Sequence, residues 1–318
     1  MSTKALELVG VERWFGHGSD AVHALRSVDL EVPAGSVLGV LGPNGAGKTT
    51  TVKMASTLLE PSRGSVLVDG IDAVRHPRAA RARLGLVLGG DRGFYLRASG
   101  LENLRFFATL AGLSHRHAES RIAELLDRVG LAGRERQRVE TYSRGMRQRL
   151  HLARAVLAAP ALLLLDEPSI GLDPEGTRDL RELVRELRAS GCGILLTTHQ
   201  LQEADELADA LVVIDHGRVV SRGSASDIAA AGGVDTVVTF ATRELLPATR
   251  ARIEAHPHVV DLDVRPRGNG HEIDLVGCGL DTDLLRAFGS ELRIDWVTRR
   301  PVTLEEAYLA FVARRGTP

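Results

Sequence analysis

The feature that most constrains the fold is a glycine-rich turn at residues 42–50, GPNGAGKTT, which fits the pattern GxxxxGK followed by Ser or Thr. It follows a continuous apolar run, SVLGVLG, typical of a strand buried in a parallel sheet, and it opens the helix-like segment KTTTVKMASTLL. The three glycines let the backbone come close enough for its N–H groups to bind phosphate oxygens at a helix N-terminus. This context favours a nucleotide site over an ordinary glycine-rich turn, which is the competing interpretation.

The residue types in the turn match the parts of a nucleoside triphosphate and its metal ion. The ammonium group of Lys48 would contact the β- and γ-phosphates, and the hydroxyl group of Thr49 would be a ligand of Mg²⁺. The predicted ATP-binding residues of the turn are Gly42, Pro43, Asn44, Gly45, Ala46, Gly47, Lys48, Thr49 and Thr50.

Two adjacent acids follow a second apolar strand, in ALLLLDEP. Strand ends and the phosphate loop share the carboxyl edge of a parallel sheet, so we expect Asp166 to hold Mg²⁺ and Glu167 to orient and deprotonate an attacking water. Alone, two acids at this place would indicate a solvated loop. Beside the phosphate loop they indicate ATP hydrolysis.

The order of strands and helices divides the chain in two. Residues 1–225 show the α/β pattern of a parallel sheet with crossover helices, interrupted by a helical block over about residues 95–157. The small-residue stretch at 223–233 indicates a hinge. Residues 226–318 then give the order β-α-β-β-α-β with one extra helix, which is the ferredoxin-like or split βαβ order of an α+β domain. We expect that domain to be regulatory or to mediate an interaction.

Composition excludes several classes of protein. With 318 residues, 44% of them hydrophobic, and a formal net charge of −1, the chain can build a sizeable core and needs no nucleic acid or anionic membrane as a partner. Its start lacks the apolar region of a signal peptide, and its longest apolar run, at residues 155–165, is too short to span a bilayer. Cys192 and Cys278 show no metal-type spacing, so we expect reduced, mostly buried thiols.

A serine turn precedes a basic helix at residues 142–149, YSRGMRQR. Ser143 and Gly145 would stand at the helix N-terminus, where amides and the helix dipole attract an anion. One alternative is a solvated capping turn with Ser143 as N-cap. Another is a nucleic-acid patch built on the arginines, which the absence of interleaved aromatic residues and the near-neutral charge disfavour.

Taken together, the motifs resemble the nucleotide-binding subunit of an ABC transporter. The phosphate loop is followed in the family's order by YSRGM, LLLLDEP, GLDP at residues 171–174 and TTH at residues 197–199. The YSRGMRQRL segment with a long C-terminal extension resembles the daunorubicin-resistance-like ATPases of type-2 ABC exporters. The resemblance covers roughly the first 220 residues, and it implies a P-loop NTPase domain with antiparallel β and helical subdomains.

That resemblance also implies partners and a location. The family binds ATP with Mg²⁺, works with a separate membrane-spanning permease, and pairs two nucleotide-binding subunits head to tail, so we expect a homodimer at the cytoplasmic face of a bacterial membrane. The anion at Ser143 and Gly145 would be the γ-phosphate of ATP held by the other subunit. The cargo would be a drug-like, antibiotic or lipid amphiphile.

Three further residues carry family roles. Asp173 matches the aspartate that communicates across the dimer interface, and His199 matches the histidine that contacts the γ-phosphate and positions Glu167. Phe15, rather than Trp14, matches the aromatic residue that stacks on adenine; a buried core aromatic is the competing interpretation.

One position departs from the family. Gly89 stands where a glutamine usually touches Mg²⁺ or the attacking water, and a water molecule or Asp91 is the expected substitute. Two other functions stay open: a soluble ABC-type ATPase in translation or DNA repair, and a regulatory module without hydrolysis. One cassette without zinc spacing or long heptads argues against the first, and the intact acids and histidine argue against the second.

Overall fold

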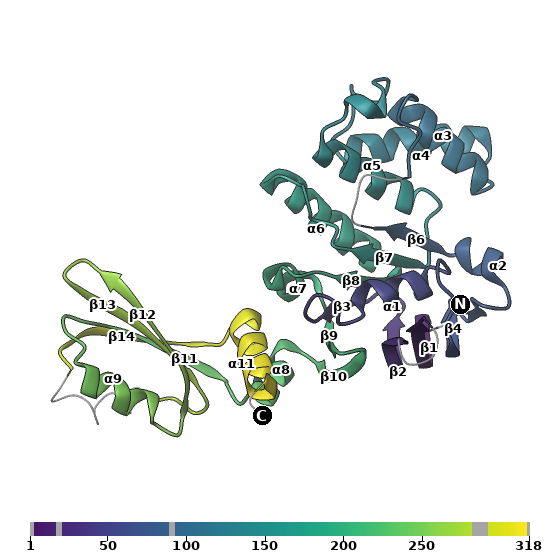
Figure 1. Ribbon diagram of the computed structural model, residues 1–318. Helices are drawn as coiled ribbons and strands as arrows, with labels where there is room; N and C mark the ends of the chain where they lie inside the picture. The colour runs from purple at the N-terminus through teal and green to yellow at the C-terminus, as the bar shows by residue number, and fades with distance from the viewer. Residues whose placement is uncertain (1–2, 17–20, 89–92, 282–291, 317–318) are drawn as a thin grey trace. The chain divides into compact units, whose positions relative to one another are not determined.

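The structure is a computed structural model that describes residues 3–16, 21–88, 93–281 and 292–316. Its contacts form two compact units, Met1–Val220 and Ser221–Pro318. Each unit has its own core and is described separately (Figure 1).

A six-stranded sheet with the order β10-β9-β3-β8-β7-β6 forms the centre of the first unit. The pairs β3–β8, β3–β9, β7–β8 and β6–β7 are parallel. All five positions are buried in each of β3, β7 and β8, as their continuous apolar runs predict. The strands are β3 (Val37–Leu41), β6 (Leu84–Val87), β7 (Leu162–Asp166), β8 (Gly193–Thr197), β9 (Ala210–Asp215) and β10 (Arg218–Gly223).

An antiparallel sheet with the order β2-β1-β4-β5 shares a core with the central sheet. Alternating positions of its long strands, such as Leu6 and Leu8, pack into the same cluster as Val40 of β3 and Leu164 of β7. Its strands are β1 (Lys4–Phe15), β2 (Val22–Pro33), β4 (Arg63–Val68) and β5 (Ile71–Asp72), and the nearby helices are α1 (Lys48–Ala55) and α2 (Pro77–Arg81).

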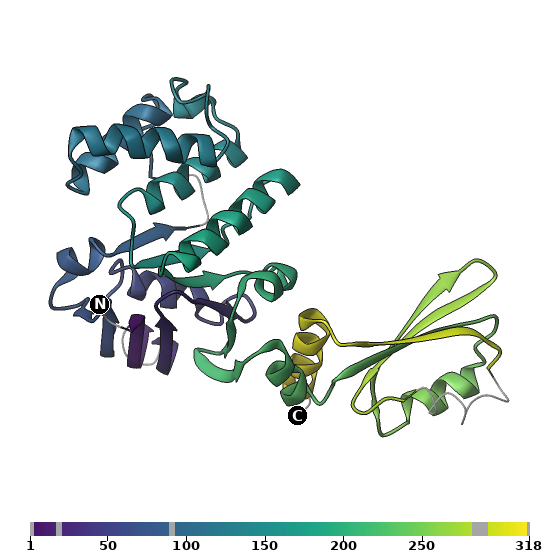
Figure 2. The ribbon, with the colours of Figure 1, turned by 180° about the vertical axis from the view of Figure 1, so that it is seen from behind.

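Three helices gather beyond β6, at the end of the unit away from the antiparallel sheet, as Figures 1 and 2 show from opposite sides. They are α3 (Gly100–Leu110), α4 (His115–Arg128) and α5 (Arg144–Val156). Apolar residues of all three, among them Leu104, Ile122 and Leu150, share one buried cluster with strand β7. Two further helices, α6 (Pro174–Ala189) and α7 (Leu201–Leu207), lie before and after β8 in the chain.

The second unit contains a four-stranded antiparallel sheet with the order β12-β13-β11-β14. Strand β13 lies between β11 and β12, which is the split βαβ arrangement expected from the sequence. Helix α9 packs along one face of the sheet in both views, while the second helix predicted for this fold, at residues 281–289, falls almost wholly outside the described residues. The elements are β11 (Thr236–Thr242), α9 (Pro247–Glu254), β12 (Val259–Arg267), β13 (Gly270–Gly277), β14 (Ile294–Pro301) and α11 (Leu304–Gly316).

The stretch at residues 223–233, predicted as a hinge into a second unit, is for the most part helix α8 (Ala225–Gly232), and the two units divide just before it, between Val220 and Ser221. Ser224 and Asp227 form a reciprocal capping box at its start, and alanine has the highest helix propensity. The helix packs closely on α11: a Cβ atom added at Gly232 would lie 2.9 Å from the backbone nitrogen of Phe311. The small residues therefore permit a helix–helix contact.

The two thiols differ in exposure. Cys192 is buried, and burial raises its pKa to about 11. Cys278 is exposed, so the expectation of mostly buried cysteines holds for only one of the two.

Candidate functional site

The phosphate loop connects β3 to α1 and lies tightly against neighbouring strands. Gly47 has φ 115°, and a Cβ atom there would come within 2.5 Å of Leu25 Cδ2 on β2. A Cβ atom at Gly42 would lie 2.1 Å from the carbonyl oxygen of Ile214 on β9. A Cβ atom at Gly42 would therefore clash with backbone, and one at Gly47 would clash with a side chain and with the Ala24 carbonyl oxygen at 2.9 Å, so glycine is favoured at both positions.

The side chain of Lys48 is folded into this loop. It is 8% exposed, and its ammonium group donates hydrogen bonds to the carbonyl oxygens of Gly42 at 2.6 Å and Pro43 at 3.1 Å. Burial lowers the pKa of Lys48, and the negative charges of Glu167 and Asp166 partly offset that effect. The loop thus surrounds a positive charge near two carboxylates, where it can meet phosphate oxygens.

Asp166 lies where three elements meet, at the end of β7. Its Oδ1 atom accepts hydrogen bonds from the hydroxyl group of Thr49 on α1, at 3.4 Å, and from that of Thr197 at the end of β8. A hydroxyl and a carboxylate oxygen are hard donors of the kind that Mg²⁺ prefers. In the part of the chain that the structure describes, no group of three or more His, Cys, Asp or Glu side chains could hold a metal ion by itself. A Mg²⁺ ion here would complete its shell with phosphate and water oxygens.

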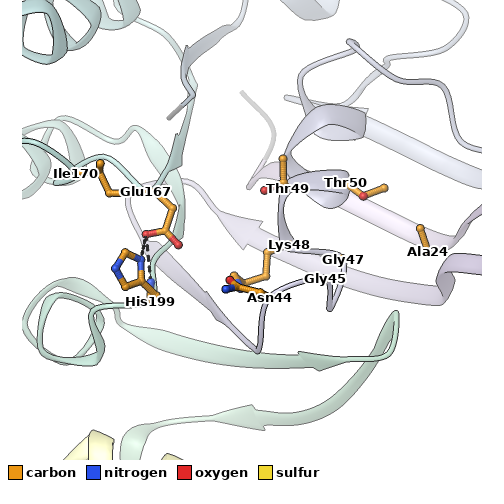
Figure 3. Close-up of a pocket in the computed structure, with 10 residues that line it drawn as sticks. All are labelled: Ala24, Asn44, Gly45, Gly47, Lys48, Thr49, Thr50, Glu167, Ile170 and His199. Atoms are coloured by element: carbon orange, nitrogen blue, oxygen red, sulfur yellow. Dashed lines mark hydrogen bonds and ion pairs between the residues drawn. The ribbon is translucent and has the colours of Figure 1, made fainter. Parts of the chain in front are cut away.

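Glu167 and His199 face each other at the ends of adjacent strands. The Nδ1 atom of His199 lies 2.6 Å from Glu167 Oε2, and the backbone N–H of His199 donates to the same oxygen at 3.2 Å (Figure 3). Glu167 has φ 54°, a left-handed conformation that is uncommon for a residue with a Cβ atom. Such a conformation costs on the order of 1–3 kcal/mol and occurs where the surroundings hold it for a function.

The phosphate loop, Glu167 and His199 line one cavity with a volume of about 520 Å³, whereas Asp166 is not among its lining residues. Figure 3 shows Glu167 and His199 across from Lys48 and the start of α1. The lining residues are Ala24, Asn44, Gly45, Gly47, Lys48, Thr49, Thr50, Glu167, Ile170 and His199. Ala24 and Ile170 were not among the predicted site residues, since no motif marked them; the folding of β2 and of the loop after β7 places them here.

A second cavity, of about 530 Å³, surrounds the start of α5 and shares no lining residue with the first. Ser143 is the N-cap of α5, and its hydroxyl group accepts a hydrogen bond from the N–H of Met146 at 3.1 Å. The capping interpretation of Ser143 therefore holds, and residues of the first turn of α5, Arg144, Gly145 and Met146, line this cavity together with Ser143.

Asp173 lines the second cavity and caps helix α6. Its Oδ1 atom accepts hydrogen bonds from the N–H of Gly176 at 2.8 Å and from Arg149 at 3.0 Å. The Gly176 N–H, followed by Arg149, holds the pKa of this carboxyl group below its usual range. The expected site residues thus form two separate groups within one chain.

Two predicted positions stand apart from these cavities. Phe15 is 41% exposed at the end of β1, with the Arg13 guanidinium group 4.7 Å from its ring centroid, and it does not line the 520 Å³ cavity. This exposure excludes the buried-core interpretation of Phe15. Trp14 packs edge-on against His23. Gly89 and Asp91 lie outside the described residues.

Comparison with known proteins identifies the family. An ABC transporter family model matches residues 25–170. The chain is 41% identical over 275 residues to a daunorubicin resistance ATP-binding protein of Streptomyces coeruleorubidus, which covers 84% of this chain and 85% of that protein. The chain belongs to the ABC transporter ATP-binding proteins.

Further relatives of this ABC protein support the same family assignment. It is 43% identical to a daunorubicin/doxorubicin resistance ATP-binding protein of Streptomyces peucetius, over 71% of this chain and 67% of that protein. A solved structure of the ATP-binding subunit of an ABC transporter is similar with a TM-score of 0.65 and 33% identity, covering 70% of this chain and 91% of that one.

The family settles the fold class and the chemistry. The predicted P-loop NTPase fold of ABC type is confirmed, and the chain is an ATP-binding ATPase. Among the described residues, no helix is both long and apolar enough to cross a membrane.

Proposed function

We propose that this chain is the ATP-hydrolysing subunit that drives a separate membrane-spanning exporter of a drug-like, antibiotic or lipid amphiphile. The observation that carries the proposal is the separation of the two cavities: one holds the phosphate loop, Glu167 and His199, and the other holds Ser143, Gly145 and Asp173. Each is half of a site that a second subunit would complete. The relatives named for daunorubicin and doxorubicin resistance support the export of an amphiphilic compound.

In the first cavity, ATP would bind with its phosphates in the loop. Lys48 would exchange its hydrogen bonds with the loop carbonyls for contacts to the β- and γ-phosphates. Thr49 and Asp166, whose side chains already meet, would hold Mg²⁺, which neutralises charge on the phosphates. Phe15 would reach adenine from the end of β1.

Hydrolysis would be carried out by the pair at the strand ends. Glu167 would accept a proton from the attacking water, and His199 would contact the γ-phosphate and hold the Glu167 carboxylate through the 2.6 Å contact. Phosphoryl transfer needs mainly positioning and charge stabilisation. The two contacts from His199 would position Glu167, and Lys48 would stabilise charge on the phosphates.

The second cavity would act on the ATP of another subunit. In a head-to-tail pair, the first-turn amides of α5 and the Ser143 hydroxyl group would approach the γ-phosphate held by the partner. Asp173, fixed by Gly176 and Arg149, would lie next to this contact. Closure around two ATP molecules and reopening after hydrolysis would drive the permease, at the cytoplasmic face of the membrane.

An affinity pull-down tests the export function. The tagged chain is recovered from detergent-solubilised membranes of its host, and its partners are identified by mass spectrometry. We expect a stoichiometric multi-span protein and a second nucleotide-binding subunit. Recovery with ribosomes or DNA-repair proteins instead would overturn export in favour of a soluble ABC-type ATPase.

A further inference from the structure

A fully buried carboxyl group lies behind the Glu167–His199 pair. Glu203, on α7, is 0% exposed. Its Oε2 atom accepts a hydrogen bond from the Ser169 hydroxyl group at 3.3 Å, while Oε1 has no hydrogen-bond partner within the described residues. Glutamate is almost never fully buried unless it is paired, so this position calls for a physical reason.

The environment of Glu203 favours the neutral carboxylic acid. Burial raises its pKa, and the negative charge of Glu167 adds to the rise. The pKa stays above its usual value although three side chains lower it: Thr198, Ser169 and Arg181. A neutral carboxyl group can bridge polar groups in the interior without the cost of burying a charge.

Glu203 lies between the two chain segments that carry the hydrolytic pair: its carboxyl group accepts from Ser169, and its own backbone N–H donates to the carbonyl oxygen of Gln200, the N-cap of α7, at 3.0 Å. Ser169 lies two residues after Glu167, and Thr198 lies one residue before His199. The Thr198 hydroxyl group accepts the N–H of Gln200 at 3.0 Å. Ser169, Thr198 and Glu203 are all buried, and hydrogen bonds link Ser169 to Glu203, Glu203 to Gln200 and Gln200 to Thr198.

The segment after Glu167 is also held from its other side. Gln148, a buried residue of α5, donates a hydrogen bond to the carbonyl oxygen of Pro168 at 2.8 Å. Pro168 and Ser169 are thus fixed between two helices, α5 and α7. The hydrogen bond to Glu203 connects Pro168 and Ser169 to α7, the helix that begins just after His199.

We propose that Glu203 is a positioning residue: its buried carboxyl group ties Ser169 to helix α7, whose N-cap Gln200 directly follows His199, and thereby sets the placement of Glu167 against His199. The left-handed backbone of Glu167 is strained and persists only where neighbouring contacts determine it. Loss of the tie would let the 2.6 Å contact between Glu167 and His199 lengthen. A displacement of about 1 Å at such a pair can cost about 100-fold in rate.

The kinetic part of the test rests on the proposed ATPase cycle. Glu203→Met keeps the volume and removes the polar atoms, whereas Glu203→Gln keeps an acceptor for Ser169 without a charge. Asp205→Asn, an exposed acid on the same helix, is the matched control. We expect kcat to fall about tenfold or more in Glu203→Met with KM for ATP within about twofold, and to stay within about twofold of wild type in the other two.

A second measurement does not depend on turnover. Amide hydrogen exchange is followed at His199 and Gln200, whose N–H groups donate to Glu167 and Thr198. We expect exchange at both to accelerate at least about tenfold in Glu203→Met and to stay unchanged in Glu203→Gln and Asp205→Asn. If the wild-type chain showed no ATPase activity, the proposed function would fail while this measurement still decided the role of Glu203.

Two outcomes would overturn the role of Glu203. One is a Glu203→Met variant with wild-type kcat and wild-type exchange at the two amides. The other is an equal loss in Glu203→Gln, which would mean that any change at this position disturbs packing. Should Glu203→Met not fold, Ser169→Ala breaks the same hydrogen bond from the other side and must give the same direction in kcat and in exchange.

Discussion

Two glycines of the phosphate loop allow steric crowding to be measured separately from backbone strain. Gly45 and Gly47 both have positive φ, 81° and 115°. A Cβ atom added at Gly45 meets nothing within 4 Å, whereas one added at Gly47 lies 2.5 Å from Leu25 Cδ2 and 2.9 Å from the Ala24 carbonyl oxygen. Gly45→Ala therefore carries only the strain, and Gly47→Ala carries strain and a clash with β2.

The expected magnitudes follow from these contacts. An L-residue in the left-handed region costs about 1–2 kcal/mol, and overpacking of a filled site costs about 1–3 kcal/mol more. We expect the free energy of unfolding of the first unit to fall by about 1–2 kcal/mol in Gly45→Ala and by about 2–5 kcal/mol in Gly47→Ala. For a unit of this size, each kcal/mol lowers Tm by about 2–4 °C.

Urea and thermal unfolding of the two variants, both without nucleotide, provide the measurement. Wild-type protein is the reference, and Gly45→Ala is the matched control for Gly47→Ala. Equal stability of the two variants would refute the reasoning, because it would show that β2 moves away from the loop without cost and that the close approach at Gly47 is not fixed by the fold.

Three further predictions concern charged groups. Glu167→Gln removes the proposed base, so ATP binding should persist while kcat falls about 100- to 10,000-fold; normal turnover in steady-state assays would exclude this role. Lys48→Ala loses charge-assisted contacts, and its Kd for ATP by calorimetry should rise about 10- to 100-fold; an unchanged Kd would contradict it. In the second unit, burial opposes ionisation of Glu306, but hydrogen bonds from Arg300 and Thr303 lower its pKa from 4.5 to about 2. The ionised Glu306 side chain contributes about 1 kcal/mol to the free energy of unfolding after solvent screening, and this contribution is present above pH 4.5 and is lost as pH falls toward 2. Glu306→Gln should therefore reduce the dependence of the free energy of unfolding on pH, measured by urea unfolding. An unchanged dependence would contradict this.

The part of the site that could be predicted from the sequence is the part whose residues lie next to easily recognised strands and turns. Strands β3 and β7 are visible in the sequence as apolar runs. Asp166 ends β7 and Glu167 follows it, while the phosphate loop leads from the end of β3 to Lys48 and Thr49 at the start of α1. Parallel strands bring those ends to one edge, so spacing along the chain is enough to predict that these residues meet. The order of elements in the second unit was readable for the same reason, since alternation and turn residues are local.

What the sequence could not predict depends on contacts between distant segments. The small residues at 223–233 are compatible with a flexible stretch or with a helix that needs close packing, and only the contact with α11 decides between the two. The exposure of Phe15 and of Cys278 likewise depends on what the surrounding chain covers. Glu203 carries no motif, and its burial follows from the meeting of α7 with the loop after β7.

The arrangement of the two cavities bears on the proposed pairing of two subunits. Glu167 and His199 line the cavity of the phosphate loop and contact each other there, whereas the start of α5 lines a different cavity. The segment after Glu167 connects the two cavities: Pro168 accepts a hydrogen bond from Gln148 of α5, and Ser169 donates one to Glu203 of α7. In the proposed head-to-tail pair, a displacement of α5 by a partner's γ-phosphate would reach Pro168, the residue that follows Glu167, through the hydrogen bond from Gln148.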